Sequence, residues 1–560
     1  MIALHGCAHQ LLRPSLGVDG QVGRTAAGAS QRAATRLAPP LLPVLRIEQV
    51  HRAGTCGGTG REGHQGSCSH ARASGRFAGQ VRVVVAQRAH VEPHARVTLE
   101  AAPLGERGQR CPRTLIGRCP ARGPATSLGR WGHIVDNLFI VGLDEANLAL
   151  LRHLPDARHT NVLPALDVDE LRGVEHFAFE RLLELAWQRL RDSPAPVHGV
   201  ATFLDFPATD LVPILAARAG VPGPSLEAVL RCDHKYWSRL VQAQAAPEAV
   251  PAFRAFDPFD PASVAALDLA YPFWVKPLNA FRSHLGFHIR GPGDLDAAIG
   301  EFHQGLERLS SPLHEVLAHV DVPPEIAALP EHAVLAEELL AGRLCTVEGY
   351  VSDGHPHAYA VVDSVREPDS SSFSRYEYPS TLPPRMQAGL CAQAERVVAA
   401  TGLDEAAFNV EVFVDADRGH FGLLEINARL SQSHAPLFEL VDGTTHLKVM
   451  VDLALGRPVS LPRRQGPFAV AAKFFLRTRE DALVRRVPDA ASLEELGHEL
   501  PGAIVHLLVA EGTRLSELSD QDAYSYELAE VYLGAHDQPE LLQRWERCRQ
   551  LLRFDLERVR

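Results

Sequence analysis

The 560-residue chain lacks several features that would place it quickly in a class of protein. No run approaches the ~18 uninterrupted apolar residues of a membrane span, and the first 30 residues lack the basic start and apolar centre of a secretory signal. No G-K-[ST] tripeptide occurs, which excludes a P-loop enzyme. An apolar fraction of 46% with 22% charged residues is typical of a globular protein with real cores. These features predict a cytoplasmic protein without a membrane partner.

The first 133 residues also lack lysine, although they hold 18 arginines and only six acidic residues. They show no hydrophobic period of a helix or a strand, which predicts a disordered extension or upstream DNA translated from a start codon placed too early. A basic nucleic-acid arm and a transit peptide are the alternatives. GTGREG at 58–63 is rejected as a phosphate-binding motif because no predicted strand precedes it and no predicted helix follows it. The group Cys56, His64, Cys68 and His70 is rejected as a zinc site because its spacing matches no common zinc pattern.

From residue 134 strands alternate with helices. NLFIVGL (137–143) and VHGVATFLDF (197–206) are predicted strands, each followed by a helical stretch, and Gly220 is predicted to end the second helix. Strands that alternate with helices indicate a parallel sheet.

Carboxylate and amide side chains share one face of a predicted hairpin further along. The stretches FNVEVFV (408–414) and FGLLEIN (421–427) alternate and bracket a turn, which predicts antiparallel strands. Glu425 and Asn427 share a face, and Glu411 is an even number of residues from Glu425, so we expect the three side chains to converge. Such oxygen ligands suit Mg²⁺ or Mn²⁺, with Arg429 placed to meet phosphates; the alternative is a polar, solvent-facing sheet surface.

Two lysines and an acidic strand end precede this hairpin. Lys235 lies in a helical stretch, and Lys276 ends the apolar strand YPFWVKPL, where a cation indicates an anion nearby. The strand in LAEELLAGR breaks after Glu337, Glu338 and Leu339. Its backbone is suited to pair with an adenine edge, while Glu337 or Glu338 accepts from ribose hydroxyls or the exocyclic amine.

The order of these parts resembles the ATP-grasp superfamily, in its carboxylate–amine-ligase and biotin-carboxylase-like (carbamoyl-phosphate-synthase-like) branch. That superfamily carries a first lysine, a V-K-P strand, a hinge of the kind E-E-x-x-x-G, a glutamate and then E-I-N-x-R. Here these are Lys235, Lys276, EELLAG at 337–342, Glu411 and EINAR at 425–429.

The resemblance covers residues 134 to 460 and implies an α/β (α+β ATP-grasp) protein. It implies an N-terminal parallel βαβ domain, a two-part ATP-grasp fold and a small C-terminal α+β domain. The predicted domains are 1–133 (extension), 134–230 (Rossmann-like), 231–330 (small ATP-grasp subdomain), 331–460 (catalytic subdomain) and 461–560 (C-terminal domain).

The resemblance further implies an ADP-forming ligase. A substrate carboxylate would attack the γ-phosphate of ATP, and an amine or another nucleophile would capture the acyl phosphate. The implied cofactors are ATP and Mg²⁺ or Mn²⁺, and the partners are small carboxylates and amines, without nucleic acid and with a homodimer as one possible assembly. The implied catalytic residues are Lys235, Lys276 and Arg429, the ATP contacts Lys235, Lys276, Glu337, Glu338, Leu339 and Glu348, and the metal ligands Glu411, Glu425 and Asn427.

Two positions depart from the superfamily pattern. The loop after Lys276 holds only Gly286 where several glycines are usual. Leu344 stands where an acidic residue is often found, which makes Glu348 a substitute for the ribose contact. Two other functions stay open: a biotin-carboxylase-like subunit, although no M-K-M segment is present, and an ATP-binding sensor without catalysis. The substrates cannot be read from the sequence.

Overall fold

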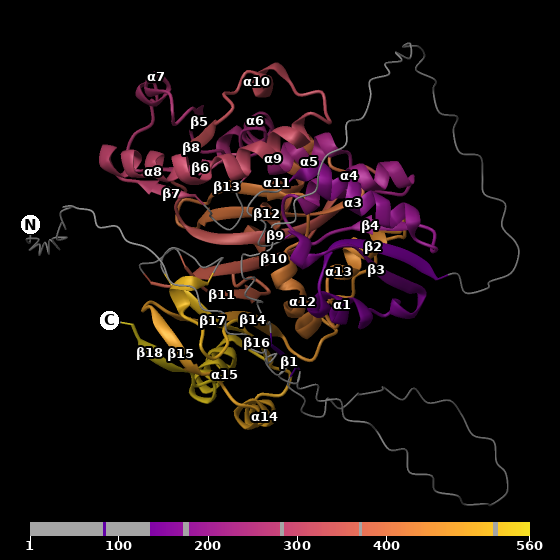
Figure 1. Ribbon diagram of the computed structural model, residues 1–560. Helices are drawn as coiled ribbons and strands as arrows, with labels where there is room; N and C mark the ends of the chain where they lie inside the picture. The colour runs from indigo at the N-terminus through magenta and orange to yellow at the C-terminus, as the bar shows by residue number, and fades with distance from the viewer. Residues whose placement is uncertain are drawn as a thin grey trace, which may run out of the picture. The chain divides into compact units, whose positions relative to one another are not determined.

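The computed structural model describes residues 135–171, 178–279, 285–368, 372–518 and 525–559, and the backbone of 82–85 (Figure 1). The two rejected motifs, and residues 280–284 of the glycine-poor loop, lie outside this part of the chain. Among the described residues no helix is both long enough and apolar enough to cross a bilayer.

The first described segment forms a three-stranded parallel sheet in the order β3-β2-β4. Its central strand is almost wholly buried because helices and neighbouring segments cover it, as expected for a parallel strand. Helix α4 ends at Gly220, whose φ of 69° is left-handed, so the predicted helix end is confirmed. The elements are β2 (Asp136–Leu143), α1 (Glu145–Arg152), η1 (Ala157–His159), β3 (Thr160–Asp167), α2 (Val168–Leu171), α3 (Phe179–Asp192), β4 (Gly199–Ala201) and α4 (Ala208–Ala219).

A four-stranded antiparallel sheet follows, in the order β5-β8-β6-β7. Two helices that lead into it, α5 and α6, pack against each other and against the hairpin described below. The elements are α5 (Leu226–Asp233), α6 (Lys235–Ala245), η2 (Pro247–Ala249), β5 (Phe253–Phe256), α7 (Pro261–Ala265), β6 (Phe273–Pro277), β7 (Phe287–Ile289), α8 (Pro292–Gly305), α9 (Glu307–Leu317), α10 (Pro324–Ala327) and β8 (Val334–Glu338).

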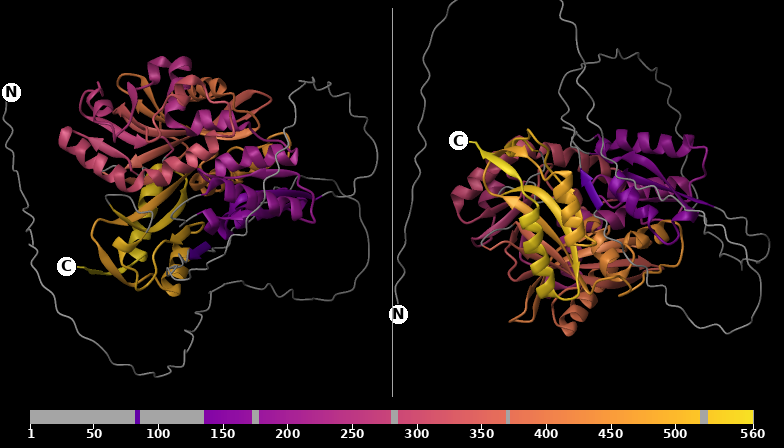
Figure 2. Two further views of the ribbon diagram at one scale, coloured as in Figure 1. Left: turned by 45° about the horizontal axis from the view of Figure 1, so that its top comes forward. Right: turned by 90° about the horizontal axis from the view of Figure 1, so that it is seen from below.

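The largest sheet has nine strands, in the order β1-β16-β17-β14-β11-β10-β9-β12-β13, and only its β1–β16 pair is parallel. Strands of the C-terminal segment thus extend the sheet that carries the predicted hairpin (Figure 2). The elements up to residue 454 are β1 (Arg82–Val85), β9 (Arg343–Ser352), β10 (His355–Arg366), β11 (Phe373–Tyr378), α11 (Pro384–Thr401), β12 (Ala406–Asp415), β13 (His420–Asn427), η3 (Gln432–His434), α12 (Ala435–Asp442) and α13 (Leu447–Ala454).

The remaining elements are β14 (Val470–Thr478), β15 (Ala482–Arg486), α14 (Ala490–Glu499), β16 (Ile504–Leu507), η4 (Leu515–Glu517), β17 (Tyr526–Ala535), α15 (Gln538–Leu551) and β18 (Asp555–Arg558). A separate ribbon pairs β15 with β18.

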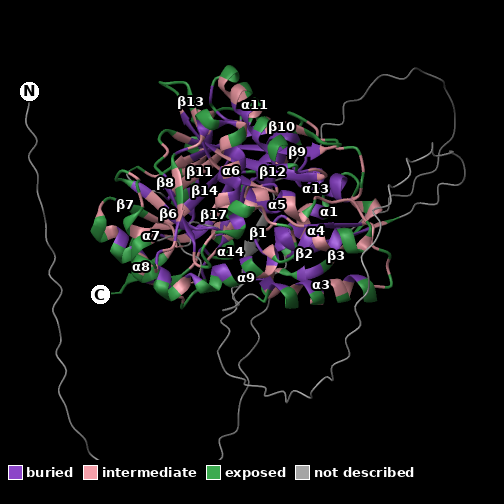
Figure 3. Cartoon of the chain, turned by 90° about the horizontal axis from the view of Figure 1, so that it is seen from above, coloured by how far each residue is buried: buried purple, intermediate pink, exposed green. Residues whose placement is uncertain are grey.

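The two faces of the large sheet differ in chemistry. One face of β9 and β12 carries Cys345, Val347, Val410 and Val412, which pack under α11 in a fully apolar cluster. Figure 3 shows these strands as buried, with exposed residues on the outer helices. Because side chains alternate, the other face carries Glu348 on β9 and the carboxylate row of β12 and β13. The predicted mixed α/β class is confirmed.

Candidate active site

The hairpin of β12 and β13 brings the two predicted metal-binding carboxylates together. Glu411 lies directly opposite Glu425, so the predicted convergence of the two carboxylates is present. The register shifts just beyond this pair, because Val412 lies opposite Leu423 and Leu424 has no partner on β12. The extra residue is a β-bulge, a feature that re-aims side chains beside functional sites. The bulge therefore decides which side chain of β13 faces Glu411.

Both predicted lysines form ion pairs with glutamates of the predicted site, one partly exposed and one buried. Lys235, the first residue of α6, places its Nζ 3.0 Å from Glu425 Oε2. Lys276, on β6, places its Nζ 2.5 Å from Glu337 Oε1 on β8. The backbone N–H of Lys235 also donates to the Leu278 carbonyl at 2.8 Å, which ties α6 to the end of β6.

These charges shift the proton affinities of one another. Burial raises the pKa of Glu411, and the carboxylate of Glu425 acts in the same direction. Burial would also raise the pKa of Glu425, but Lys235 and Lys276 outweigh it and lower that pKa. Burial lowers the pKa of Lys276, with Glu337 opposing. The lysines therefore favour the charged form of Glu425, whereas the charged form of Glu411 would be favoured by a further cation nearby.

Asn427 and Arg429 continue the row beyond Glu425. Asn427 Nδ2 donates to Asn409 Oδ1 at 2.9 Å, so its amide oxygen, the atom that a metal ion would use, is not consumed by this bond. Asn409 in turn donates to the Arg429 carbonyl at 2.9 Å. The Arg429 guanidinium forms a salt bridge with Asp205, in the loop between β4 and α4. Its predicted phosphate contact stays a prediction.

The predicted adenine hinge divides into a buried and an exposed part. Glu337 is 3% exposed and held by cations, whereas Glu338 and Leu339 are exposed at the end of β8. The predicted break is present, since β8 ends at Glu338 and β9 begins at Arg343. Gly342 closes it with a φ of 114°, and a Cβ there would lie 2.3 Å from the Val414 carbonyl oxygen. Glycine is therefore required at this position.

Glu348 lies in a different cluster from the lysines. It is fully buried on β9, accepts from His434 Nδ1 at 2.8 Å and from the Ser431 N–H at 3.3 Å, and lies 3.9 Å from His446 Nε2. The structure thus brings Glu348 to the segment after Arg429, and its ribose contact stays a prediction.

The donor set fits a hard divalent cation that also binds phosphate. Two facing carboxylates and an amide oxygen are the ligands that Mg²⁺ takes from proteins while it keeps waters or substrate oxygens. Within the described residues no group of three or more His, Cys, Asp and Glu side chains could hold a metal ion. The carboxylate pair would therefore need further ligands from a nucleotide.

Sequence reasoning missed Arg239 and Asp205. Arg239 lies one turn after Lys235 on α6 and contacts Glu337, and its i, i+4 spacing from Lys235 was an available signal. Asp205 is 224 residues from its partner Arg429, so no local pattern could connect them.

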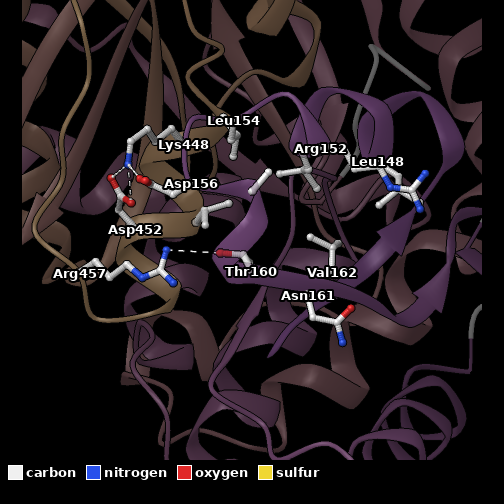
Figure 4. A pocket seen from close by; sticks show the side chains of 13 residues that line it. Leu148, Arg152, Leu154, Asp156, Thr160, Asn161, Val162, Lys448, Asp452 and Arg457 are labelled. Carbon is white, nitrogen blue, oxygen red and sulfur yellow. Dashed lines mark hydrogen bonds and ion pairs between the residues drawn. The ribbon is translucent and has the colours of Figure 1, made fainter. Parts of the chain in front are cut away.

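A cavity of about 240 Å³ lies away from these groups, among α1, β3 and α13 (Figure 4). In that view Lys448 contacts Asp452, at 2.7 and 2.8 Å, and Arg457 points to Thr160. Because Lys448, Asp452 and Arg457 are already paired with one another or with neighbours, the cavity is a weak candidate for the reaction.

Comparison with known proteins gives one match to a family model. Residues 377–461 match the family of carbamoyl-phosphate synthase L chain ATP-binding domains, and they include Glu411, Glu425, Asn427 and Arg429. No curated protein matches the chain in sequence.

Three solved structures share the fold. An L-amino acid ligase from Bacillus licheniformis has a TM-score of 0.58 at 16% identity, covering 76% of this chain and 99% of that chain. An N5-carboxyaminoimidazole synthase from Aspergillus clavatus, in complex with ADP and 5-aminoimidazole ribonucleotide, has a TM-score of 0.51 at 15% identity, covering 75% and 99%. A biotin carboxylase from Campylobacter jejuni has a TM-score of 0.50 at 13% identity, covering 76% and 93%. The described part of the chain therefore has the fold of these ATP-grasp structures, and residues 377–461 match an ATP-binding-domain family, in line with the motifs.

Proposed function

We propose that the chain is an ADP-forming ATP-grasp ligase that joins a small carboxylate to an amine through an acyl phosphate. The observation that supports this most is the pairing of Glu411 with Glu425 near two lysines, Lys235 and the buried Lys276. Phosphoryl transfer needs positioning and charge neutralisation more than a side-chain nucleophile, and these residues provide both.

In this proposal each residue has a separate task. Lys276 and Lys235 neutralise phosphate oxygens of ATP, and the exposed hinge at Glu338 and Leu339 holds the nucleoside. Glu411, Glu425 and Asn427 hold Mg²⁺ or Mn²⁺, which would neutralise charge on the phosphates when bound. Lys235 now faces Glu425, so nucleotide binding would exchange a carboxylate partner for a phosphate.

The reaction has two steps, phosphoryl transfer and then capture by the amine. A carboxylate oxygen of the substrate attacks the γ-phosphorus of ATP, and the bond from that phosphorus to the β,γ-bridging oxygen breaks, releasing ADP. The amine then attacks the carbonyl carbon of the acyl phosphate, and inorganic phosphate leaves with one oxygen of the original carboxylate while the amine loses a proton. In this proposal Arg429, which pairs with Asp205, would neutralise charge on the phosphates.

The test is ADP release with pooled amino acids and short carboxylates as substrates. Hydroxylamine should trap a hydroxamate, and ¹⁸O should pass from the carboxylate into inorganic phosphate. Glu425→Gln should abolish turnover while the fold is kept, because a charged ligand is lost at constant volume. Glu227→Gln, a partly exposed glutamate on α5 that pairs with Arg231, is the matched control and should retain turnover.

Two outcomes would replace this proposal. Tight ATP binding without cleavage over a broad substrate screen would favour a sensor, and the loop at 279–286 would be the first place to seek the reason. Bicarbonate-dependent ADP release with free biotin would favour the carboxylase alternative. Full turnover in Glu425→Gln would refute the metal assignment.

A further inference from the structure

Arg239 is a fully engaged arginine at the centre of the candidate site. It lies on α6, four residues after Lys235, and is 2% exposed. A guanidinium carries its five N–H donors on three nitrogens, and here every one of these nitrogens contacts an acceptor. Nε and Nη2 contact Glu337 Oε2 at 2.9 and 2.8 Å, Nη1 reaches the Gln242 side chain and the Leu423 carbonyl (3.0 Å), and Nη2 reaches the Leu424 carbonyl at 2.8 Å.

The two carbonyls that Arg239 holds belong to the β-bulge. Among the strands of the described ranges, β13 lies at an edge of the large sheet, so its outer backbone groups face no further strand there. Leu424 is the extra residue of the bulge, between the pair Val412 with Leu423 and the pair Glu411 with Glu425. A bulge interrupts the ladder of backbone hydrogen bonds, and Arg239 supplies donors at this interruption.

The position of the bulge decides which residue faces Glu411. If the register of Val412 with Leu423 continued by one residue, Leu424 would lie opposite Glu411 and the carboxylate of Glu425 would move to the next position. A one-residue slip of a strand reverses the face of every side chain beyond it. Glu425 and Asn427 would then turn toward the apolar face that packs under α11.

We propose that Arg239 is a positioning residue that fixes the β-bulge at Leu424, so that Glu425 faces Glu411 in the register a metal–nucleotide complex requires. Through Nε and Nη2 the same guanidinium also holds Glu337, the partner of Lys276. One side chain thus sets the distance between the lysine on β6 and the carboxylates on β13. The inference rests on the proposed metal role of Glu411 and Glu425.

The test is Mn²⁺ binding to the full chain in the presence of ADP, followed by electron paramagnetic resonance. Arg239→Met should raise the Mn²⁺ dissociation constant at least tenfold, toward that of Glu425→Gln, and Arg239→Lys should recover part of the loss. Arg231→Met is the matched control on the preceding helix, where the guanidinium contacts Glu227 and the Thr401 carbonyl, and it should stay within twofold of the wild type.

Deletion of Leu424 separates a register role from general support of the core. Without Leu424 the hairpin pairs Glu411 with Glu425 with no bulge, so Arg239→Met or Arg239→Lys in that background should change Mn²⁺ affinity less than threefold. If either substitution costs the same in both backgrounds, or if Arg239→Lys binds Mn²⁺ like the wild type, the register role is overturned. Should Arg239→Met not fold, the lysine variant carries the comparison.

Failure of the proposed function would look different. In that case the wild type would not bind Mn²⁺ with ADP, or Glu425→Gln would bind as well as the wild type. Retained binding in the arginine variants with loss in Glu425→Gln would overturn only the role of Arg239.

Discussion

Replacing Glu337 with glutamine keeps the volume of the side chain but removes the negative charge that faces Lys276 and Arg239. The three side chains are between 2% and 10% exposed, so solvent cannot compensate for the change. Removing one partner of a buried ion pair typically costs about 3 to 5 kcal/mol, because the remaining charge stays buried without compensation. We therefore expect Glu337→Gln to destabilise the protein by an amount of this order.

The assay is thermal unfolding of the full chain at pH 7. A loss of 1 kcal/mol lowers the melting temperature of a unit of 150 to 250 residues by about 2 to 4 °C, so the expected fall is about 6 to 20 °C. The double variant Glu337→Gln with Lys276→Met removes one of the stranded cations. It should lose less stability than the sum of its single variants, by about 0.5 to 3 kcal/mol.

Glu248→Gln is the matched control for this experiment. Glu248 pairs with Arg396 at the surface, where both side chains are about half exposed. Exposed ion pairs contribute little to stability, so the melting temperature should stay within about 1 °C of the wild type. An equally small shift for Glu337→Gln would refute the view that its charge is needed to hold the two buried cations.

Three further predictions follow from other parts of the chain. Lys276→Ala and Lys235→Ala should each lower kcat/KM by an amount equal to about 2 to 4 kcal/mol of lost transition-state stabilisation. In the double variant the loss should be smaller than the sum of the two single losses. Burial would raise the pKa of Glu530, but Lys473 and His506 together outweigh it and hold that pKa at about 2. The charged carboxylate should therefore stabilise the protein fully above pH 4.5 and progressively less as pH falls toward 2. Glu530→Gln should thus lower the melting temperature at pH 7 and match the wild type near pH 2. A chain that starts at residue 132 should bind ATP like the full chain in calorimetry, and loss of binding would show that the extension is needed.

Lysine is scarce throughout the chain and not only in the extension. Only four of the 56 basic residues are lysine, so a stretch of 133 residues without lysine is not unusual in this chain. Four residues of the extension also pair with β16 as strand β1. Three of the four lysines, Lys235, Lys276 and Lys473, each form an ion pair with a glutamate. A compact ammonium serves such positions differently from a planar guanidinium.

The alternating pattern of the hairpin was enough to single out the predicted metal row. Glu425 and Asn427 are recognisable because side chains two apart on a strand share a face. Together with Glu411 on the preceding strand they place polar side chains in stretches that are otherwise apolar. The two lysines were recognisable for a similar reason, since each interrupts or adjoins an apolar stretch. Local periodicity carried this part of the site.

Only the tertiary structure decided which partners these residues take. Next to the turn, Asp415 pairs with His420, five residues away. Without a bulge this register would place Leu424 opposite Glu411. Glu425 pairs with Glu411 only because Leu424 is an extra residue in β13. A bulge has no reliable sequence signal, because it depends on donors that another element brings to the strand edge. Here the donors come from Arg239, 184 residues away from Leu423.

The same limit explains the hinge and the far end of the row. Glu337 and Glu338 are adjacent and chemically alike, and the fold alone buries the first against Arg239 and exposes the second. Glu348 was predicted as a substitute ribose contact, which stays a prediction. The fold adds a contact with His434, because strand β9 runs past the hinge to the segment that follows Arg429. Burial and charge partners come from packing between distant segments, and a single sequence records only the residue types that such packing can use.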